Sequence, residues 1–303
     1  MRRSIVIDTD PGIDDAVAIL LALRSPELDI RGITTVAGNI GIATTTRNAG
    51  RILALAGRAD VPVVAGSAAP LSRRGFDVAE IHGDDGLGGV AFPDPLLPSG
   101  DDAVGWLAAL LDESIAGSVN VLALGPLTNI ARLVLDHPAS ARRIGRVVAM
   151  GGAIHEPGNI GPRSEFNLAA DPEAAEIVLR SGLPLVLVPL DVTRKVRATC
   201  GYTAVLSTSD GAAGRAASDL IEAYFQSGTG RESRPLHDPC VMLHAVEPAL
   251  FGMETLKLSV DTGDGPDAGA LSVDEAAGIA VDVAMTVDAP GALRLLARRL
   301  ADG

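Results

Sequence analysis

The first 190 residues alternate short, β-branched apolar runs with longer segments in which apolar residues recur at helical spacing. Residues 4–8 form the first apolar run, and residues 13–23 form the first helical segment, with Ile13, Val17 and Leu20 on one face. Such alternation indicates a parallel sheet covered by helices on both faces. The further expected strands are 28–36, 62–65, 119–124, 147–150 and 185–190, and the further expected helices are 42–56, 103–116, 127–135 and 172–179.

The pattern becomes more helical after Asp191. Helices are expected at 203–206, 212–225, 239–245 and 291–300, and strands at 256–260, 270–273 and 279–287. Loop-rich segments at 66–101 and 155–170 interrupt the alternation. No composition break, repeat or low-complexity tract forces a boundary, so we predict one α/β domain over residues 1–303.

Composition narrows the possible partners. The chain is 47% hydrophobic, which suffices for a large core, but no apolar run reaches the roughly 18 residues of a membrane span. The two cysteines, Cys200 and Cys240, cannot build a disulfide framework or a typical zinc site, which favours a reducing cytoplasm. The net charge of −13 disfavours binding to nucleic-acid phosphates and favours a neutral ligand or a cation.

Four aspartates lie within eight residues, where the first expected strand meets the first helix: Asp8, Asp10, Asp14 and Asp15. The two-residue repeat of a strand directs Asp8 and Asp10 to the same side. A helix N-terminus offsets part of the repulsion, and an acidic cap would explain one or two of these residues. All four together indicate a bound divalent cation, and such oxygen ligands suit Ca²⁺ or Mg²⁺ and not zinc.

Other polar residues follow the later strands. Open α/β sheets bind ligands in the crevice outside the carboxyl ends of their strands, so these residues are expected to share one rim. In chain order they are Asn39, His82 to Asp85, Leu124 to Asn129, Met150, Asn159, Glu165 and Asn167.

His237-Asp238-Pro239 is a further candidate. Asp followed by Pro is an ordinary helix start, and we interpret Asp171-Pro172 as a cap alone. From these residues alone, His237 can equally be a surface histidine or a functional one.

The segment Asp8-Thr9-Asp10-Pro11-Gly12-Ile13-Asp14-Asp15-Ala16 resembles the signature of the inosine–uridine-preferring nucleoside hydrolases. Further motifs follow in family order and extend the resemblance over about residues 4 to 250: Gly38-Asn39, His82-Gly83, Gly125 to Ala131, Met150 to Gly152, Glu165 to Asn167, Asp171 to Ala175 and His237 to Pro239. The resemblance implies one α/β domain with a mostly parallel, Rossmann-like central sheet flanked by helices, assembled as a homodimer or homotetramer. It also implies tightly bound Ca²⁺ and the hydrolysis of ribonucleosides, a small-molecule substrate, to ribose and free base.

The resemblance also implies roles for individual residues. Asp10, Asp15 and Asp238 would bind Ca²⁺ through their carboxylates, and Leu124 through its backbone carbonyl. Asp10 would take the proton of the attacking water, and His237 would protonate the departing base. The implied substrate-binding residues are Asp14 and Asn167 at the 2′ and 3′ hydroxyls, Asn39 at the ribose, Asn159 and Glu165 at the 5′ hydroxyl, Met150 under the sugar, and His82 at the base.

Base preference is less constrained. His237 is typical of the inosine–uridine-preferring branch, and His82 of some members that include pyrimidine-preferring ones, so the resemblance implies a pyrimidine or mixed inosine/uridine preference. The segment 224–236 would supply part of the base pocket, with Tyr224 and Phe225 as its aromatic candidates. Trp106 lies in a helical pattern far from these motifs and is expected in the core.

Two alternatives compete with this interpretation. A Mg²⁺-dependent phosphohydrolase of the haloacid dehalogenase type also has two aspartates spaced like Asp8 and Asp10, but its phosphate site should be more basic, and Lys195 and Lys257 are the only lysines. A non-catalytic ribose- or nucleoside-binding protein of the same fold would be favoured by loss of Asp10 or of several metal ligands, all of which are present.

Overall fold

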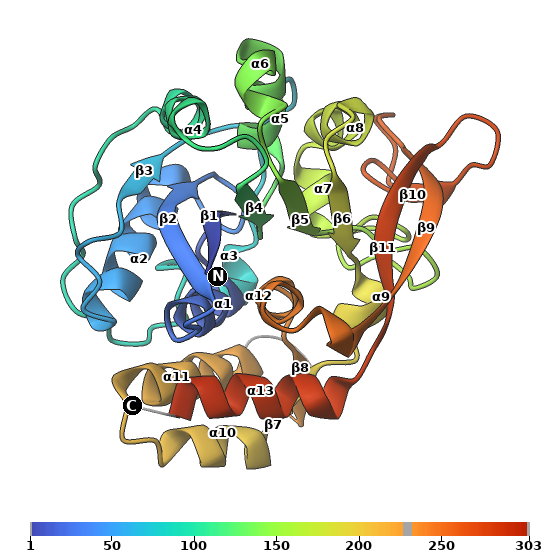
Figure 1. The fold of residues 1–303 in the computed structure, drawn as a ribbon. Coiled ribbons are helices and arrows are strands. Elements are labelled where there is room, and N and C mark those ends of the chain that lie inside the picture. The colour runs from blue at the N-terminus through green and yellow to red at the C-terminus, as the bar shows by residue number, and fades with distance from the viewer. Residues whose placement is uncertain (1, 227–231, 302–303) are drawn as a thin grey trace.

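The computed structural model describes residues 2–226 and 232–301 and contains one nine-stranded sheet in the order β10-β9-β11-β6-β5-β4-β1-β2-β3 (Figure 1). The strands of this sheet are β1 (Arg3–Thr9), β2 (Leu28–Thr35), β3 (Val63–Ala65), β4 (Val119–Ala123), β5 (Arg146–Met150), β6 (Leu185–Val188), β9 (Phe251–Val260), β10 (Leu271–Val273) and β11 (Ile279–Val287). The seven neighbouring strands β11, β6, β5, β4, β1, β2 and β3 pair in parallel. Strands β9 and β10 extend the sheet beyond β11 by antiparallel pairing. The expectation of one α/β domain with a mostly parallel central sheet is confirmed.

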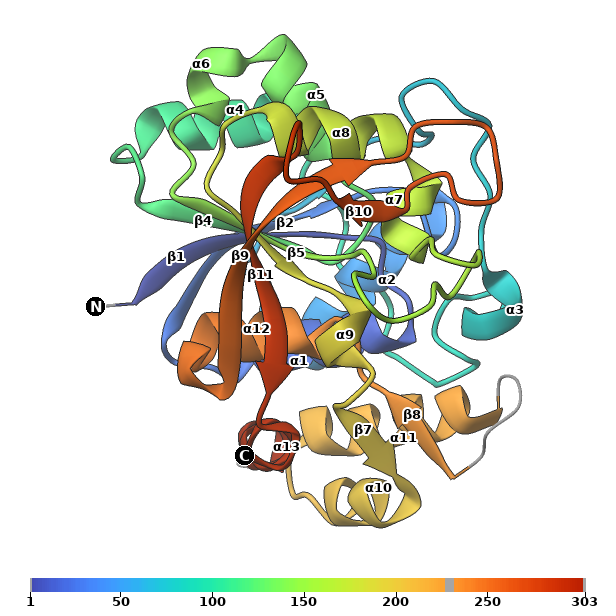
Figure 2. The same cartoon turned by 90° about the vertical axis from the view of Figure 1, so that its right-hand side faces the viewer.

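Helices cover both faces of the sheet (Figure 2). One face carries α4 (Ala103–Glu113), α5 (Thr128–Asp136), α6 (Pro138–Ala141) and α8 (Pro172–Arg180). The other carries α1 (Ile13–Leu23), α2 (Ile42–Leu55) and α12 (Pro239–Val246), with α10 (Cys200–Ser207), α11 (Ala212–Gln226) and α13 (Ala289–Ala301) outside them. No helix in the described part of the chain is long and apolar enough to cross a membrane.

Helix α1 is central to the position of the site. Every residue from Ile13 to Ala22 is buried, because α1 lies between the sheet and the outer helix α11 and also packs on α12. Its N-terminus therefore places Asp14 and Asp15 inside the protein. The Asp15 carboxylate accepts a hydrogen bond from the Gly12 backbone N–H at 3.0 Å, which caps the helix from within its own first turn.

Several short elements were not predicted. These are α3 (Ala79–His82), α6, α7 (Phe166–Ala170), α9 (Leu190–Thr193) and the small antiparallel pair β7 (Arg197–Thr199) and β8 (Ser233–Pro235). Four or five residues are too few to show a period, so tertiary contacts decide such segments. Strand β9 also begins at Phe251, five residues before the expected 256, because its outer half is held by pairing with β11 and not by an apolar pattern. Trp106 is partly buried, packs against Gly32 and the hydrophobic core, and does not line the cavity described below, in agreement with its expected place in the core.

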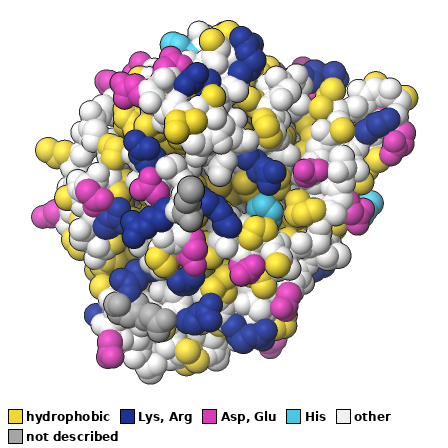
Figure 3. Space-filling model, viewed as in Figure 1, with side chains coloured by type: hydrophobic (Ala, Val, Ile, Leu, Met, Phe, Trp, Pro, Cys, Tyr) yellow, Lys and Arg dark blue, Asp and Glu magenta, His cyan; other side chains and the backbone are white. Residues whose placement is uncertain are grey.

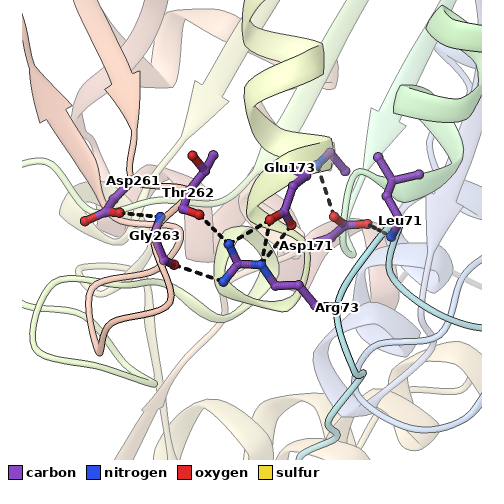
Figure 4. A network of polar contacts seen from close by, with 8 residues as sticks. Leu71, Arg73, Asp171, Glu173, Asp261, Thr262 and Gly263 are labelled. Atoms are coloured by element: carbon purple, nitrogen blue, oxygen red, sulfur yellow. Dashed lines mark hydrogen bonds and ion pairs between the residues drawn. The ribbon is translucent and has the colours of Figure 1, made fainter.

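A polar network joins the 66–101 segment to α8 and to the β9–β10 hairpin (Figure 4). The Arg73 guanidinium binds the Glu173 carboxylate and donates to the backbone carbonyls of Thr262 and Gly263. Asp171 caps α8 by accepting from the Ala174 N–H at 3.1 Å, which confirms the interpretation of this residue as a cap. Its other oxygen accepts from the Leu71 N–H and the Thr128 hydroxyl, so one buried carboxylate ties three segments together.

Replacing Asp171 by alanine is expected to lower the free energy of unfolding by about 3 kcal/mol, because the change removes a cap and leaves buried donors unpaired. The matched control is Asp288→Ala, which removes an exposed carboxylate that caps the N-terminus of α13 through the Gly291 N–H. This loss should be about 1 kcal/mol. Urea unfolding of both variants measures the difference, and equal losses would contradict the role given to the buried network.

Candidate active site

A cavity of about 240 Å³ opens at the carboxyl ends of β4 and β5, beside the N-termini of α1, α7 and α12. It is lined by residues from segments far apart in the sequence: Asp14, Asn39, Val78, Ile81, His82, Leu124, Met150, Asn159, Ile160, Glu165, Phe166, Asn167, Arg194, Tyr224, Arg234, Pro235, His237 and Asp238. Except for Asp10 and Asp15, all the site residues expected from the sequence line this cavity. The structure thus brings these residues together at one end of the sheet, whereas Asp84, Asp85 and Asn129 of the expected rim lie outside the lining.

Three carboxylates meet at the acidic end of the cavity. Asp14, Asp15 and Asp238 each offer an oxygen within 4.8 Å of the others, and all three side chains are buried. Asp14 and Asp15 come from the first turn of α1, and Asp238 precedes α12. Asp238 occupies the N-cap position but makes no side-chain cap hydrogen bond, so its carboxylate faces the other acids instead of its own helix.

Asp10 is fully buried beside this cluster. Its Oδ2 accepts from the Asn39 backbone N–H at 2.6 Å, while its Oδ1 has no hydrogen-bond partner among the described residues. A Cβ atom added at Gly38 would lie 2.1 Å from Oδ2, and one at Gly125 would lie 2.4 Å from Oδ1. Both glycines are therefore required for the chain to close around this carboxylate.

Asp8 belongs to a different network. Its Oδ1 accepts from the Thr34 hydroxyl at 2.5 Å and from the Asn129 side-chain amide at 2.8 Å. Asn129 also holds the Ser67 N–H and the Thr35 carbonyl. Asp8 thus joins the ends of neighbouring segments and does not line the cavity.

Burial and the charges of neighbouring carboxylates raise the pKa of Asp10, Asp14 and Asp238. Burial, followed by the charge of Asp15, raises the pKa of Asp14 to about 7 and holds the pKa of Asp10 well above its usual range. Burial and the charges of Asp14, Asp15 and Asp10 raise the pKa of Asp238 in the same way. Each shift means that the protein alone disfavours the charged form at this position.

These residues fit a hard divalent cation. All the candidate ligand atoms are oxygens, and the Oδ1 atom of Asp10 is buried without a partner. Among residues 2–226 and 232–301, no lysine or arginine side chain is hydrogen-bonded to these carboxylates. Leu124 also lines the cavity, and its carbonyl accepts a hydrogen bond from the Asn167 side chain at 2.6 Å. A cation at this place would relieve the repulsion that raises the carboxyl pKa values.

Asn39 and Asn167 hold the wall of the cavity between the acids and the strand ends. The Asn39 side-chain amide donates to the Asp15 carboxylate at 2.9 Å and to the Asp10 carbonyl at 3.2 Å. The Asn167 amide donates to the carbonyl of Met150 at 3.2 Å and lies 3.4 Å from its sulfur. In the described part of the chain, each of these asparagines uses its Nδ2 in these bonds and leaves its Oδ1 available to a ligand.

Glu165 and Asn159 lie at the other side of the cavity. Glu165 caps α7 by accepting from the Asn167 and Leu168 N–H groups, and it also accepts from the Gly152 N–H at 3.0 Å. Burial raises the pKa of Glu165 to about 7. Asn159 uses its Oδ1 to accept from the Phe166 N–H at 2.9 Å, which leaves its amide N–H groups for a ligand.

Two histidines approach the cavity from the α3 and α12 sides. The His237 Nδ1 lies 2.8 Å from the Thr193 hydroxyl, and burial together with the charges of Arg194 and Arg197 lowers the pKa of His237 to about 3. His82 accepts the Ile13 N–H through its Nδ1 at 3.0 Å, so the neutral ring carries its proton on Nε2. Burial lowers the pKa of His82 to about 4.

Tyr224 and Arg234 line the cavity beside His82. The Tyr224 ring stacks near His82, with centroids 6.3 Å apart, and Arg234 lies 5.2 Å from the centre of the Tyr224 ring. Phe225 is buried in the core and does not line the cavity. The segment 224–236 was expected to supply part of the base pocket: Tyr224, Arg234 and Pro235 line the cavity, and residues 227–231 lie outside the described residues.

Sequence reasoning missed Arg194, Arg234 and Thr193. Arg194 donates to the carbonyls of Pro157 and Gly158 and so orders the loop that carries Asn159. It follows β6, so extending the search for polar strand-end residues to that strand would have found both Thr193 and Arg194. Arg234 carries no comparable signal, because it lies in a three-residue strand.

The description of the matching family model is "Inosine-uridine preferring nucleoside hydrolase", and the match covers residues 5–294. The pyrimidine-specific ribonucleoside hydrolase RihA of Photobacterium profundum is 38% identical over 311 residues, with both chains fully covered. RihA of Citrobacter koseri is 39% identical over 99% of each chain.

Solved structures of the same kind superpose over nearly the whole chain. A plant nucleoside hydrolase, the PpNRh1 enzyme, has a TM-score of 0.92 and 34% identity and covers 100% of both chains. A purine-preferring ribonucleoside hydrolase from Gardnerella vaginalis has a TM-score of 0.91 and 32% identity over 99% of this chain and 98% of that one.

Proposed function

Because this chain belongs to the inosine–uridine preferring nucleoside hydrolase family and is thus an enzyme of ribonucleoside hydrolysis, we propose that it acts with Ca²⁺ on pyrimidine nucleosides. The observation that carries the proposal is the buried group of Asp14, Asp15 and Asp238 at one end of the cavity, next to the unpaired Oδ1 of Asp10. Membership of this family disfavours the alternative of a Mg²⁺-dependent phosphohydrolase, because the family members hydrolyse nucleosides. It also disfavours the alternative of a non-catalytic binding protein, because the family members are enzymes.

The proposed ligands of Ca²⁺ are the carboxylates of Asp10, Asp15 and Asp238 and the carbonyl of Leu124. Asp14 lies close enough to share the ion, and we assign it to a ribose hydroxyl beside the ion. When bound, the cation would lower the pKa of a water molecule and offset the negative charge of the cluster.

Asp10 is the proposed general base. Cleavage breaks the bond between ribose C1′ and the base nitrogen, and positive charge builds on the sugar as in other glycoside hydrolyses. Water adds to C1′ from the opposite face, and its proton passes to the Asp10 carboxylate, whose pKa is raised by burial. Asp10 returns that proton to solvent after ribose leaves.

The ribose is proposed to lie between the acids and Glu165. Asp14 and the free Oδ1 of Asn167 accept from the 2′ and 3′ hydroxyls, and Asn39 offers a second amide oxygen to the sugar. Asn159 donates to the 5′ hydroxyl beside Glu165, and the Met150 side chain packs under the ring. Several fixed hydroxyls orient C1′ for attack, which lowers the activation entropy cost.

His237 is the proposed proton donor to the departing base. The donor is the imidazolium form of His237, in which the Thr193 hydroxyl lies at Nδ1 and Nε2–H is left for the base; the lowered pKa makes this form a minor but strongly acidic species. The base leaves with the Nε2 proton, the ring becomes neutral, and it regains a proton from solvent. The Thr193 hydroxyl fixes the orientation of the ring.

Replacing His237 by alanine is expected to lower kcat/KM for inosine by about 10²- to 10⁴-fold, the usual contribution of a general acid. Hydrolysis of 4-nitrophenyl riboside should fall far less, because nitrophenolate leaves without a proton. Steady-state kinetics on both substrates make the comparison. Equal losses would remove the proton-donor role, whereas a positioning role for the ring would move KM for both.

The proposed base preference rests on hydrogen-bond donors at the base end of the cavity. The Nε2–H of His82 and the Arg234 guanidinium suit the carbonyl oxygens of uracil and cytosine. Hypoxanthine also carries one carbonyl, but adenine carries none. The pyrimidine-specific RihA enzymes support this preference, while the purine-preferring relative makes it a question for experiment.

Ribose release is therefore expected to rank uridine and cytidine above inosine, and adenosine last. A reducing-sugar assay on the four nucleosides at equal concentration tests the ranking. Equal or faster release from adenosine would reject the proposed preference without affecting the reaction class. His82→Ala is expected to narrow the difference between uridine and adenosine.

We also propose a cytoplasmic homodimer or homotetramer. Cys200 is exposed and Cys240 is buried, and two cysteines cannot build a disulfide framework, which suits a reducing compartment. Light scattering of the purified protein would give the mass of the assembly.

A further inference from the structure

A second polar cavity lies at the opposite end of the sheet from the site described above. It has a volume of about 310 Å³ and is formed where β1, β4 and β5 begin and where α12 ends. Its lining is made by Arg3, Ile5, Gly117, Asn120, Leu122, Gly145, Arg146, Val148, His244, Ala245 and Pro248. Figure 3 looks onto the side of the molecule that carries the strand starts, and dark blue side chains lie beside a histidine near its middle.

The charge of this cavity is opposite to that of the whole protein. Two arginines, Arg3 and Arg146, and one histidine line it, and its lining contains no carboxylate, although the chain carries a net charge of −13. The Arg146 side chain is exposed and makes no hydrogen bond or ion pair with another described residue. Arg3 donates through one nitrogen to the carbonyls of Ala245 and Val246, which covers the negative end of α12.

His244 adds a buried polar group to the same wall. The residue is 6% exposed, its Nδ1 is buried without a partner, and its ring lies edge-on to Phe251. Burial and the nearby charges of Arg146 and Arg3 lower the pKa of His244 to about 4, so both guanidinium groups lie close to the ring. A buried imidazole without a hydrogen-bond partner is uncommon, and it points to a group that completes the site.

We propose that this cavity is a second ligand site, distinct from the catalytic one, that binds the phosphoryl group of inorganic phosphate or of a small phosphate ester. Arginine forks match the oxygen spacing of phosphate and bind it through charge-assisted hydrogen bonds. Arg146 supplies the free fork, Arg3 a second positive charge, and His244 with Asn120 supplies neutral polar groups. The volume lies at the lower end of the range for small-molecule pockets, which suits a phosphoryl group with at most a short attached chain.

Isothermal titration of the purified, calcium-loaded enzyme with inorganic phosphate and with glycerol 3-phosphate tests the proposal and separates free phosphate from an ester. Ionic strength is matched with chloride, and saturating ribose occupies the catalytic cavity throughout. Arg146→Gln is expected to weaken phosphate binding about tenfold or more, because it removes a charge-assisted contact. Arg142→Gln, which changes another exposed arginine of the same region outside the lining, is the matched control and should bind like the wild type.

The outcomes separate this site from the catalytic one. Arg146→Lys should recover part of the lost affinity, and ribose release from uridine without phosphate should equal that of the wild type in all three variants. The proposal is overturned if the wild type shows no saturable binding of either probe, or if Arg142→Gln weakens binding as much as Arg146→Gln. A failed assay for nucleoside hydrolysis would leave this binding result unchanged, because the two measurements use different cavities.

Discussion

Replacing Asp10 by asparagine is expected to reduce kcat for uridine by about 10³-fold or more while the fold is kept. The reason is geometric as well as chemical. The oxygen of the new amide can still accept the hydrogen bond that the Asn39 N–H donates to Oδ2 of Asp10, so the turns at Gly38 and Gly125 that close around this side chain keep their shape. The amide cannot take a proton from water, and it is a weaker ligand for a cation than a carboxylate.

The control for this variant is Asp8→Asn, which alters an equally buried aspartate of the same strand end. Asp8 binds Thr34 and Asn129 and does not line the cavity, so its replacement should change kcat by less than about tenfold. Both variants are assayed at saturating calcium, with bound metal measured on the same samples. An Asp10→Asn enzyme that binds calcium and keeps kcat within tenfold of the wild type would remove Asp10 as the general base.

Removal of the divalent cation is expected to abolish ribose release and to lower thermal stability. In the metal-free protein the buried carboxyls of Asp10, Asp14 and Asp238 repel one another, as their raised pKa values indicate. Calcium at 100 times its dissociation constant should stabilise the folded state by about 2.7 kcal/mol, or roughly 5 °C in Tm for a chain of this size.

Dialysis against a chelator, followed by calorimetry and the ribose assay with calcium or magnesium added back, tests this expectation. Calcium should restore both properties, and magnesium should restore them less, because a site of several buried carboxylates suits the larger ion. Asp238→Asn should lose most of the calcium-dependent rise in Tm. Full activity of the chelated, metal-free enzyme would contradict the proposed role of the cation.

Three glycines near the active site, Gly38, Gly125 and Gly12, are required for a reason that the sequence motifs do not show. Gly38 and Gly125 stand in the ordered motifs, but no local pattern says that both press against the Asp10 carboxylate. Gly12 is similar, since a Cβ atom there would lie 2.6 Å from the His82 Nδ1. In each case the partner comes from another segment of the chain, so the requirement for glycine becomes visible only when the protein is folded.

The fold class was predictable because its cause is local. Apolar periods specified α1 and β11 to the residue and placed most other long elements within a few residues, since burial on one or both faces dictates those periods. Short elements such as α3 and α7 were not predictable. The N-cap of α7 is Glu165, whose carboxylate is also held by the Gly152 N–H across the cavity wall.

By itself, the sequence determined the α/β class, the acidic cluster after β1 and the set of polar strand ends, because strand and helix periods and charge density are properties of short segments. Only the tertiary structure decided that Asp238 joins Asp14 and Asp15 without capping its own helix, and that Asp8 is diverted to Thr34 and Asn129. It also decided which Nδ1 partners orient His82 and His237, and that Arg3, Arg146 and His244 meet at the far end of the sheet. The physical reason is that each of these arrangements joins residues distant in the chain, whose approach depends on the parallel order of β1, β4 and β5 and on the packing of α12 beside α1.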